Sequence, residues 1–303
     1  MDEKQPRSTR DERLTRLLDA AEATQQDPAS ILYAHTVMCQ TGLPYRNPGD
    51  DVRMWERLNG GVHLRVRAGD AMHPELGRLV ELGLPYGPKP RLILFHLNAE
   101  ALRQGSPLIE VDESLTGFVK RVGLASHGRN ITTIKEQLAR LAASHVTLGI
   151  ARNGEAVTVN TQIVTAFNLW FPKVDGQRVL WPSTVQLSAD YFDSLTRHAV
   201  PLHDRALAAL SGSAMALDVY AWLAQRLHRI NPNKPAFVAW ANLQEQFGGH
   251  YDRIRKFREV FTATLRMVQT QYRGASVELD TRGVTLRHSP PPVKGRTVLI
   301  RKG

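Results

Sequence analysis

Apolar side chains recur at helical spacing in the middle of the chain. In residues 129–144 the recurring positions are Ile131, Ile134, Leu138 and Leu141. This pattern predicts an amphipathic helix with one buried stripe. A second helical pattern over residues 113–123 precedes it, separated by Ala125-Ser-His-Gly128. Two helices joined by so short a turn predict a helix-turn-helix.

The polar side of the second helix carries groups that can address base edges and phosphates. They are Arg129, Asn130, Thr132, Thr133, Lys135, Glu136 and Arg140. Amide, hydroxyl and guanidinium groups in this arrangement are typical of a recognition helix. A solvated helix face without any DNA contact explains the same pattern, so this segment alone leaves both interpretations open.

A β-hairpin is predicted directly after this helix. Residues 146–150 and 156–163 are strand-like, and Asn153-Gly154 between them is the strongest short-range hairpin signal. Together with a preceding helical run and the short apolar stretch of residues 107–111, this order predicts a winged helix. Arg152 and Asn153 would lie at the tip of its wing.

The second half of the chain repeats this plan. A helical pattern over residues 213–230 is followed by the strand-like residues 237–240 and a short helix over residues 242–247. Gly248-Gly249 then takes the place of the turn, and a long helix over residues 250–272 follows. Residues 276–287 predict a second hairpin with Arg282 at its tip.

We therefore predict an α+β protein with two tandem winged-helix domains and an N-terminal extension. The predicted divisions are a flexible or helical segment over residues 1–30, an extension with the first winged helix over 31–200, a second winged helix over 201–289 and a basic tail over 290–303. The boundary is placed near Pro201. The alternating residues 62–67 predict a strand in the extension, which is expected to pack on the first winged helix.

The charge distribution points to an anionic partner. The formal net charge is +10, and residues 196–303 carry 17 Lys and Arg against 7 Asp and Glu, whereas residues 1–195 carry 22 of each. Such a field attracts nucleic acid or anionic lipid without choosing between them. No apolar run reaches the length of a membrane span, and the first residues lack the order of a signal peptide, so a cytoplasmic, nucleoid- or plasmid-associated bacterial protein is expected.

Motifs for catalysis or cofactor binding are missing from the sequence. There is no Gly-x-x-x-x-Gly-Lys-Ser/Thr and no dinucleotide fingerprint, and Cys39 is the only cysteine. His198 and His203 have a metal-like spacing, but they flank Pro201 without further ligands. Asp112-Glu113 is explained by a helix N-terminus. We expect no enzyme activity, no cofactor and no metal.

Two such helices, each with cations near its N-terminal end, favour docking on a DNA duplex. The predicted contact residues are Ser126, His127, Arg129, Asn130, Thr132, Thr133, Lys135, Arg140, Arg152, Asn153, His250, Tyr251, Arg253, Arg255, Lys256, Arg258 and Arg282.

Four stretches of the chain resemble the RepA-type plasmid replication initiators. They are Thr41-Gly-Leu-Pro-Tyr-Arg-Asn-Pro-Gly-Asp50 with Trp55-Glu-Arg57, Gly83-Leu-Pro-Tyr-Gly-Pro-Lys-Pro-Arg-Leu92, Ser114-Leu-Thr-Gly-Phe-Val119, and residues 128–141. The resemblance runs from about Ile31 to Leu286 and is most specific between Gly83 and Leu141. Ala99 departs from it, since a Thr is expected there.

The resemblance implies a protein that binds repeated sites at a plasmid origin and helps to open the adjacent duplex. It also implies recruitment of host initiator and helicase proteins, and a homodimer in equilibrium with the monomer, in which dimers repress the protein's own promoter. A winged-helix transcriptional regulator that acts as a dimer is the main alternative, and inverted half-sites would favour it. A non-specific, chromatin-like protein is a third, and it would show strong salt dependence without sequence preference.

Overall fold

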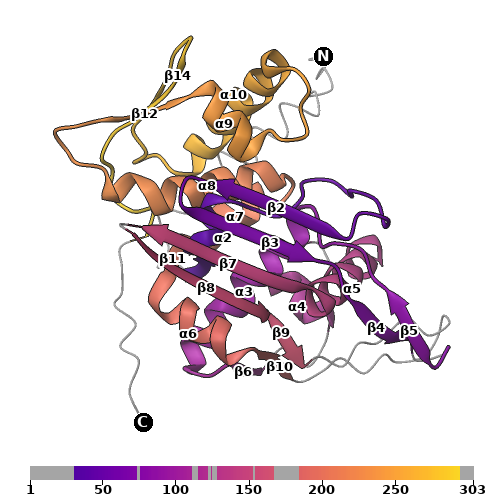
Figure 1. Cartoon of the computed structure of the whole chain (residues 1–303). Helices are drawn as coiled ribbons and strands as arrows, with labels where there is room; N and C mark the ends of the chain where they lie inside the picture. Colours follow the sequence, from indigo (N-terminus) through magenta and orange to yellow (C-terminus); the bar gives the residue numbers. More distant parts are fainter. Residues whose placement is uncertain are drawn as a thin grey trace, which may run out of the picture.

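The protein is a mixed α+β molecule, as the sequence predicts. The computed structural model describes residues 31–73, 76–110, 115–121, 124, 128–152, 154–166 and 184–293. The segments predicted over residues 1–30 and after residue 293 lie outside these ranges. Helices alternate with small antiparallel sheets along the described chain. In Figure 1 the C-terminal elements lie on one side of α8 (Ala214–Arg226) and the largest sheet lies on the other.

The largest sheet joins the N-terminal extension to the first predicted hairpin. Its order is β2 (Met54–Asn59), β3 (Val62–Arg67), β7 (His145–Arg152) and β8 (Glu155–Gln162), all antiparallel. Val62, Leu64 and Val66 of β3 alternate into the core, as the period of two predicts. Gly154 has a φ of +83°, which a tight hairpin turn requires and which glycine adopts without strain. The extension thus packs on the hairpin by adding two strands to it.

The short strand of the first predicted winged helix belongs to a different sheet. β6 (Leu108–Glu110) pairs with β10 (Thr184–Leu187), which pairs in turn with β9 (Val164–Ala166). The β7–β8 hairpin pairs with β3 instead. Only Ile163 separates β8 from β9, so the chain passes directly from one sheet into the other. A further hairpin, β4 (Asp70–His73) and β5 (Arg78–Glu81), projects beside them (Figure 1).

Three helices form the centre of the N-terminal half, which contains these sheets. α3 (Pro88–Gln104) starts with proline in its first turn and ends at Gly105, whose φ of +64° gives a left-handed cap. α3 is buried over most of its length, and α5 (Gly128–Ala143) packs against it with Ile134, Leu138 and Leu141 inward. α4 (Leu115–Arg121) precedes α5, so the two predicted helices are present, and the turn predicted between them lies outside the described residues.

Distant parts of the sequence meet in a small sheet at the middle of the molecule. β1 (Ile31–His35), followed by α2 (Thr36–Gln40), pairs with β11 (Ala199–His203). Pro201, where a domain boundary is predicted, lies inside β11 opposite Tyr33. α6 (Ala189–His198) precedes β11, and α7 (Asp204–Leu210) follows it. The residues flanking Pro201 are therefore part of a strand and not of a linker.

The C-terminal elements follow the predicted order with one shifted boundary. α8 and a 3-10 turn (Leu227–Arg229) lead to β12 (Ala236–Ala239), α9 (Trp240–Phe247), α10 (Ile254–Gln271), β13 (Val277–Leu279) and β14 (Gly283–Leu286). β14 lies between β12 and β13 in an antiparallel sheet. Phe257, Phe261 and Leu265 form the buried stripe of α10, as their spacing predicts.

The long helix predicted over residues 250–272 begins four residues later than expected, at Ile254. The Tyr251 N–H donates to the Gly248 carbonyl at 2.8 Å, so residues 248–251 form a turn. The first helical bond runs from the Phe257 N–H to the Arg253 carbonyl at 3.1 Å. His250 and Tyr251 consequently lie in the turn before α10, and Arg253 is its N-cap.

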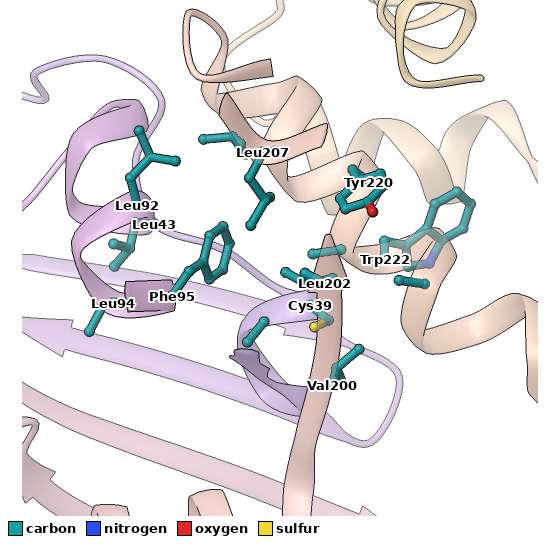
Figure 2. Packing of buried hydrophobic residues seen from close by; sticks show 14 of the residues in the cluster. Cys39, Leu43, Leu92, Leu94, Phe95, Val200, Leu202, Leu207, Tyr220 and Trp222 are labelled. Atoms are coloured by element: carbon teal, nitrogen blue, oxygen red, sulfur yellow. The ribbon is translucent and has the colours of Figure 1, made fainter. Parts of the chain in front are cut away.

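One continuous apolar core holds the two halves together. Figure 2 shows α3, β11 and α8 meeting there through Phe95, Leu202 and Tyr220. A buried ion pair crosses the same junction, because Arg91 Nε lies 2.6 Å and Nη2 2.8 Å from the two carboxylate oxygens of Asp218. The remaining Arg91 N–H groups donate to the Leu43, Pro44 and Gly87 carbonyls. The guanidinium is therefore satisfied on all sides.

Candidate nucleic-acid interface

The outer face of α5 presents part of the predicted set to solvent. Arg129 and Thr132 are exposed, and Asn130, Thr133 and Lys135 are half-buried. The Thr133 hydroxyl donates to the Arg129 carbonyl at 2.9 Å, so it is used within the helix. Neither Arg129 nor Lys135 forms an ion pair with another described residue. These two cations are therefore available to an external anion.

Arg140 points away from this exposed face. Its side chain is 11 % exposed, and Nη2 lies 3.1 Å from both Asp50 Oδ1 and Glu136 Oε1. Nη1 donates to the Leu84 carbonyl at 3.3 Å, and the guanidinium lies 5.3 Å from the centre of the Tyr86 ring. These contacts fasten α5 to the loop that contains Asp50. Arg140 therefore has an intramolecular role that helical spacing alone does not reveal.

Three predicted residues fall outside the described chain. They are Ser126, His127 and Asn153. The backbone of Arg152 is described, and it pairs with Glu155 at the end of β7.

The start of α10 is the most strongly cationic part of the predicted set. Arg253, Arg255 and Lys256 are exposed, and the first turn holds no acidic residue. Lys256 Nζ is 2.9 Å from Glu259 Oε1, while neither Arg253 nor Arg255 pairs with an acid in the described residues. The helix dipole adds a partial positive charge at the same end, which suits a phosphate. Arg258 instead lies against the core, with its guanidinium 5.1 Å from the centre of the Trp240 ring.

The β13–β14 turn presents a further arginine. The Asp280 carboxylate accepts from the backbone N–H groups of Arg282 at 2.6 Å and Gly283 at 2.9 Å, and these bonds lower the pKa of Asp280. The turn is thereby fixed, and the Arg282 side chain is 82 % exposed. The guanidinium lies 5.7 Å from the centre of the half-exposed Phe237 ring.

Beside α10, the predicted residue His250 lies near Arg46 and Arg57, which the sequence did not single out as DNA contacts. His250 makes an edge contact with Tyr45, and their ring centres are 5.5 Å apart. The ring centres of His250 and Tyr251 are 4.1 Å apart. Burial lowers the pKa of His250, and so do the positive charges of Arg46 and Arg57. Residues 41–50 stand out in the sequence only as a motif shared with a family, because nothing in their spacing shows that they contact residue 250, two hundred positions away.

The described residues hold no group arranged as a metal centre. Within them, no group of three or more His, Cys, Asp or Glu side chains is arranged to hold a metal ion. None of the helices that the structure describes combines the length and hydropathy of a membrane span. The small cavity beside Arg91 and Asp218 is lined by Leu43, Leu94 and Phe95 among others, and it lies in the core junction.

Comparisons with known proteins complete this description. The family model described as "Plasmid encoded RepA protein" matches residues 84–242, which is more than half of the chain. No curated protein sequence matches this chain. Among solved structures, a selenomethionine derivative of domains 2 and 3 of RctB is similar with a TM-score of 0.52 and 11% identity, covering 81% of this chain and 94% of that one. A second crystal structure of RctB domains 2–3 has a TM-score of 0.49 and 12% identity, covering 82% and 94%. At such identities the likeness to the first structure concerns the fold alone.

Proposed function

The chain belongs to the family of plasmid-encoded RepA proteins, and from this membership we propose that it is a replication initiator that binds repeated double-stranded DNA sites at a plasmid origin. The observation that carries the proposal is the exposed cationic end of α10, where Arg253 and Arg255 have no acidic partner among the described residues. A helix end with free guanidinium groups is suited to phosphates and to guanine edges.

The C-terminal unit acts in this proposal as a winged helix. Its element order, from α8 through β12, α9 and α10 to the β13–β14 hairpin, supports this interpretation, as does the pairing of β12 with that hairpin. α10 would enter a major groove, and Arg282 in the hairpin turn would contact a phosphate. In this scheme Lys256 assists, and Arg258 braces the helix against Trp240.

α5 provides the second reading helix in the proposal. Arg129 and Thr132 are exposed at its N-terminal half, where recognition helices contact base edges. The β7–β8 hairpin serves as its wing, although it lies in a sheet with β2 and β3. Arg140 is left out of this interface because its guanidinium is held by Asp50 and Glu136. In this proposal the two reading helices belong to the two units predicted from the sequence.

The wider activity follows from family membership rather than from any contact described above. It comprises opening of the duplex beside the repeats, recruitment of host initiator and helicase proteins, and a monomer–dimer equilibrium in which dimers repress the gene. In this proposal the chain itself carries out no catalysis, needs no cofactor and works in the bacterial cytoplasm on plasmid DNA.

Replication of a plasmid that depends on this gene and its flanking DNA tests the proposal. We expect the double variant Arg253→Ala, Arg255→Ala to lose replication and wild-type protein supplied in trans to restore it. Arg78→Ala removes an exposed arginine from the β4–β5 hairpin and should leave replication intact. Normal replication with the double variant would contradict the role of α10. Failure of the wild-type gene to support replication while it represses its promoter would favour the dimeric regulator.

A further inference from the structure

A single loop contacts α5 at one end and the turn before α10 at the other. At one end of residues 45–50, the Tyr45 ring touches His250 in the turn before α10. At the other end, Asp50 accepts a hydrogen bond from Arg140 of α5 at 3.1 Å. The loop thus joins α5 to the turn that precedes α10.

Cations gather where the loop meets the turn. Arg46 is exposed and lies close enough to His250 and Tyr251 to influence the pKa of both. Arg57 of β2 also influences the pKa of His250, and its guanidinium lies 4.4 Å from the centre of the Trp55 ring. A Cβ on Gly249 would lie 2.2 Å from Arg57 Nη1, so glycine at this position lets the turn approach the guanidinium closely.

The two arginines of this cluster, Arg46 and Arg57, have no ion-pair partner among the described residues. Asp218 influences Arg57, but both of its carboxylate oxygens are bonded to Arg91. Asp50 is likewise paired with Arg140. Like charges held this close repel one another, and an external anion between them would relieve the repulsion.

We propose that Arg46, Arg57 and His250 form a phosphate-binding site that holds the DNA backbone between the segments read by α5 and α10. This inference rests on the proposed function and adds a contact that belongs to neither reading helix. Three elements supply the site: the loop of residues 45–50, β2 and the α9–α10 turn. Because the loop contacts α5 and the turn before α10, a phosphate bound there fixes the distance between the two DNA segments.

The test uses the full-length protein and duplexes that carry a single methylphosphonate, which removes the charge of one phosphate. A footprint first locates the two DNA segments of a binding site that the protein protects. The modification is then moved stepwise through the DNA between these segments. We expect one or two positions at which it weakens binding by the wild-type protein. The variant Arg46→Ala should bind unmodified DNA more weakly than the wild type does. The modification at those positions should not weaken its binding further. The slope of log K against log salt should fall by about 0.9, because this variant neutralises one phosphate fewer.

Two controls make the outcome specific. Arg78→Ala also removes an exposed arginine, from the β4–β5 hairpin, and should keep the wild-type response to the modification. Arg57→Gln is a second test variant, and its thermal unfolding midpoint shows whether it folds. The site is refuted if Arg46→Ala and Arg57→Gln remain as sensitive to the modification as the wild type. Absence of sequence-specific binding by the wild type would overturn the proposed function as well. Specific binding by the wild type without any position sensitive to the modification would refute the phosphate-binding site alone.

Discussion

His35 shows how one buried side chain links stability to pH. Its Nε2 lies 2.9 Å from Ser194 Oγ, and its Nδ1 accepts from the Val37 N–H at 3.2 Å. Burial, and then the charge of His198, lowers the pKa of His35 to about 3. The ring is therefore neutral in the folded protein, and it takes up a proton more readily when the chain unfolds.

We predict that the free energy of unfolding falls as the pH drops below the ordinary histidine value. The folded pKa lies below the unfolded one, so the stabilisation is complete above about pH 6.5 and is lost progressively toward the folded value. The loss between pH 7 and pH 5 should be about 2 kcal/mol, measured by chemical denaturation. His35→Asn retains an acceptor for Val37 and should flatten this dependence. An equally steep dependence in the variant would show that other groups cause it.

Arg129 and Lys135 are the residues expected to distinguish DNA sequences. Because both side chains are accessible on α5 and have no ion pair among the described residues, Arg129→Ala and Lys135→Ala should weaken binding to the cognate site by about 1–3 kcal/mol and to random DNA by less. Titrations on both duplexes at one salt concentration measure this difference. Equal losses on the two would make these residues phosphate contacts.

Helix α10 is expected to contribute charge as well as shape. The double variant Arg255→Ala, Lys256→Ala should reduce the slope of log K against log salt by about 0.9 for each phosphate that it no longer neutralises, and we expect at least one such phosphate. Lys256 is partly neutralised by Glu259 at 2.9 Å, so Arg255 should account for most of the change. An unchanged slope would place α10 away from the DNA.

The junction between α3 and α8 depends on the buried pair of Arg91 and Asp218, whose side chains are 4% and 6% exposed. Asp218→Ala leaves a buried guanidinium without its partner, and we expect it to reduce the free energy of unfolding by about 3–5 kcal/mol. Arg287→Ala breaks the exposed pair with Glu278 and should cost much less, because water screens both charges. Chemical denaturation of the two variants measures the difference, and similar losses would mean that the Arg91 pair is energetically like a surface pair.

Across the molecule, local patterns predicted the elements better than their partners. The strand over residues 62–67 and the β13–β14 hairpin were predicted correctly, because alternation and turn residues are local signals. The pairing of β1 with β11 was not, since it joins residues far apart in the sequence and Pro201 suggested a linker. The same limit applies to the candidate interface. Helical spacing identified Arg129 and Arg255, but it could not show that Arg140 turns inward or that Arg46 lies beside His250.

The most direct test of the central claim is a footprint of the purified protein on the DNA flanking its own gene, across a concentration series. We predict protection of several evenly spaced direct repeats in one orientation, each with two protected segments that correspond to α5 and α10. The variant Arg253→Ala, Arg255→Ala should lose the segment contacted by α10 first. A single inverted repeat over a promoter, or no discrete protection at all, would contradict an initiator that reads repeated sites.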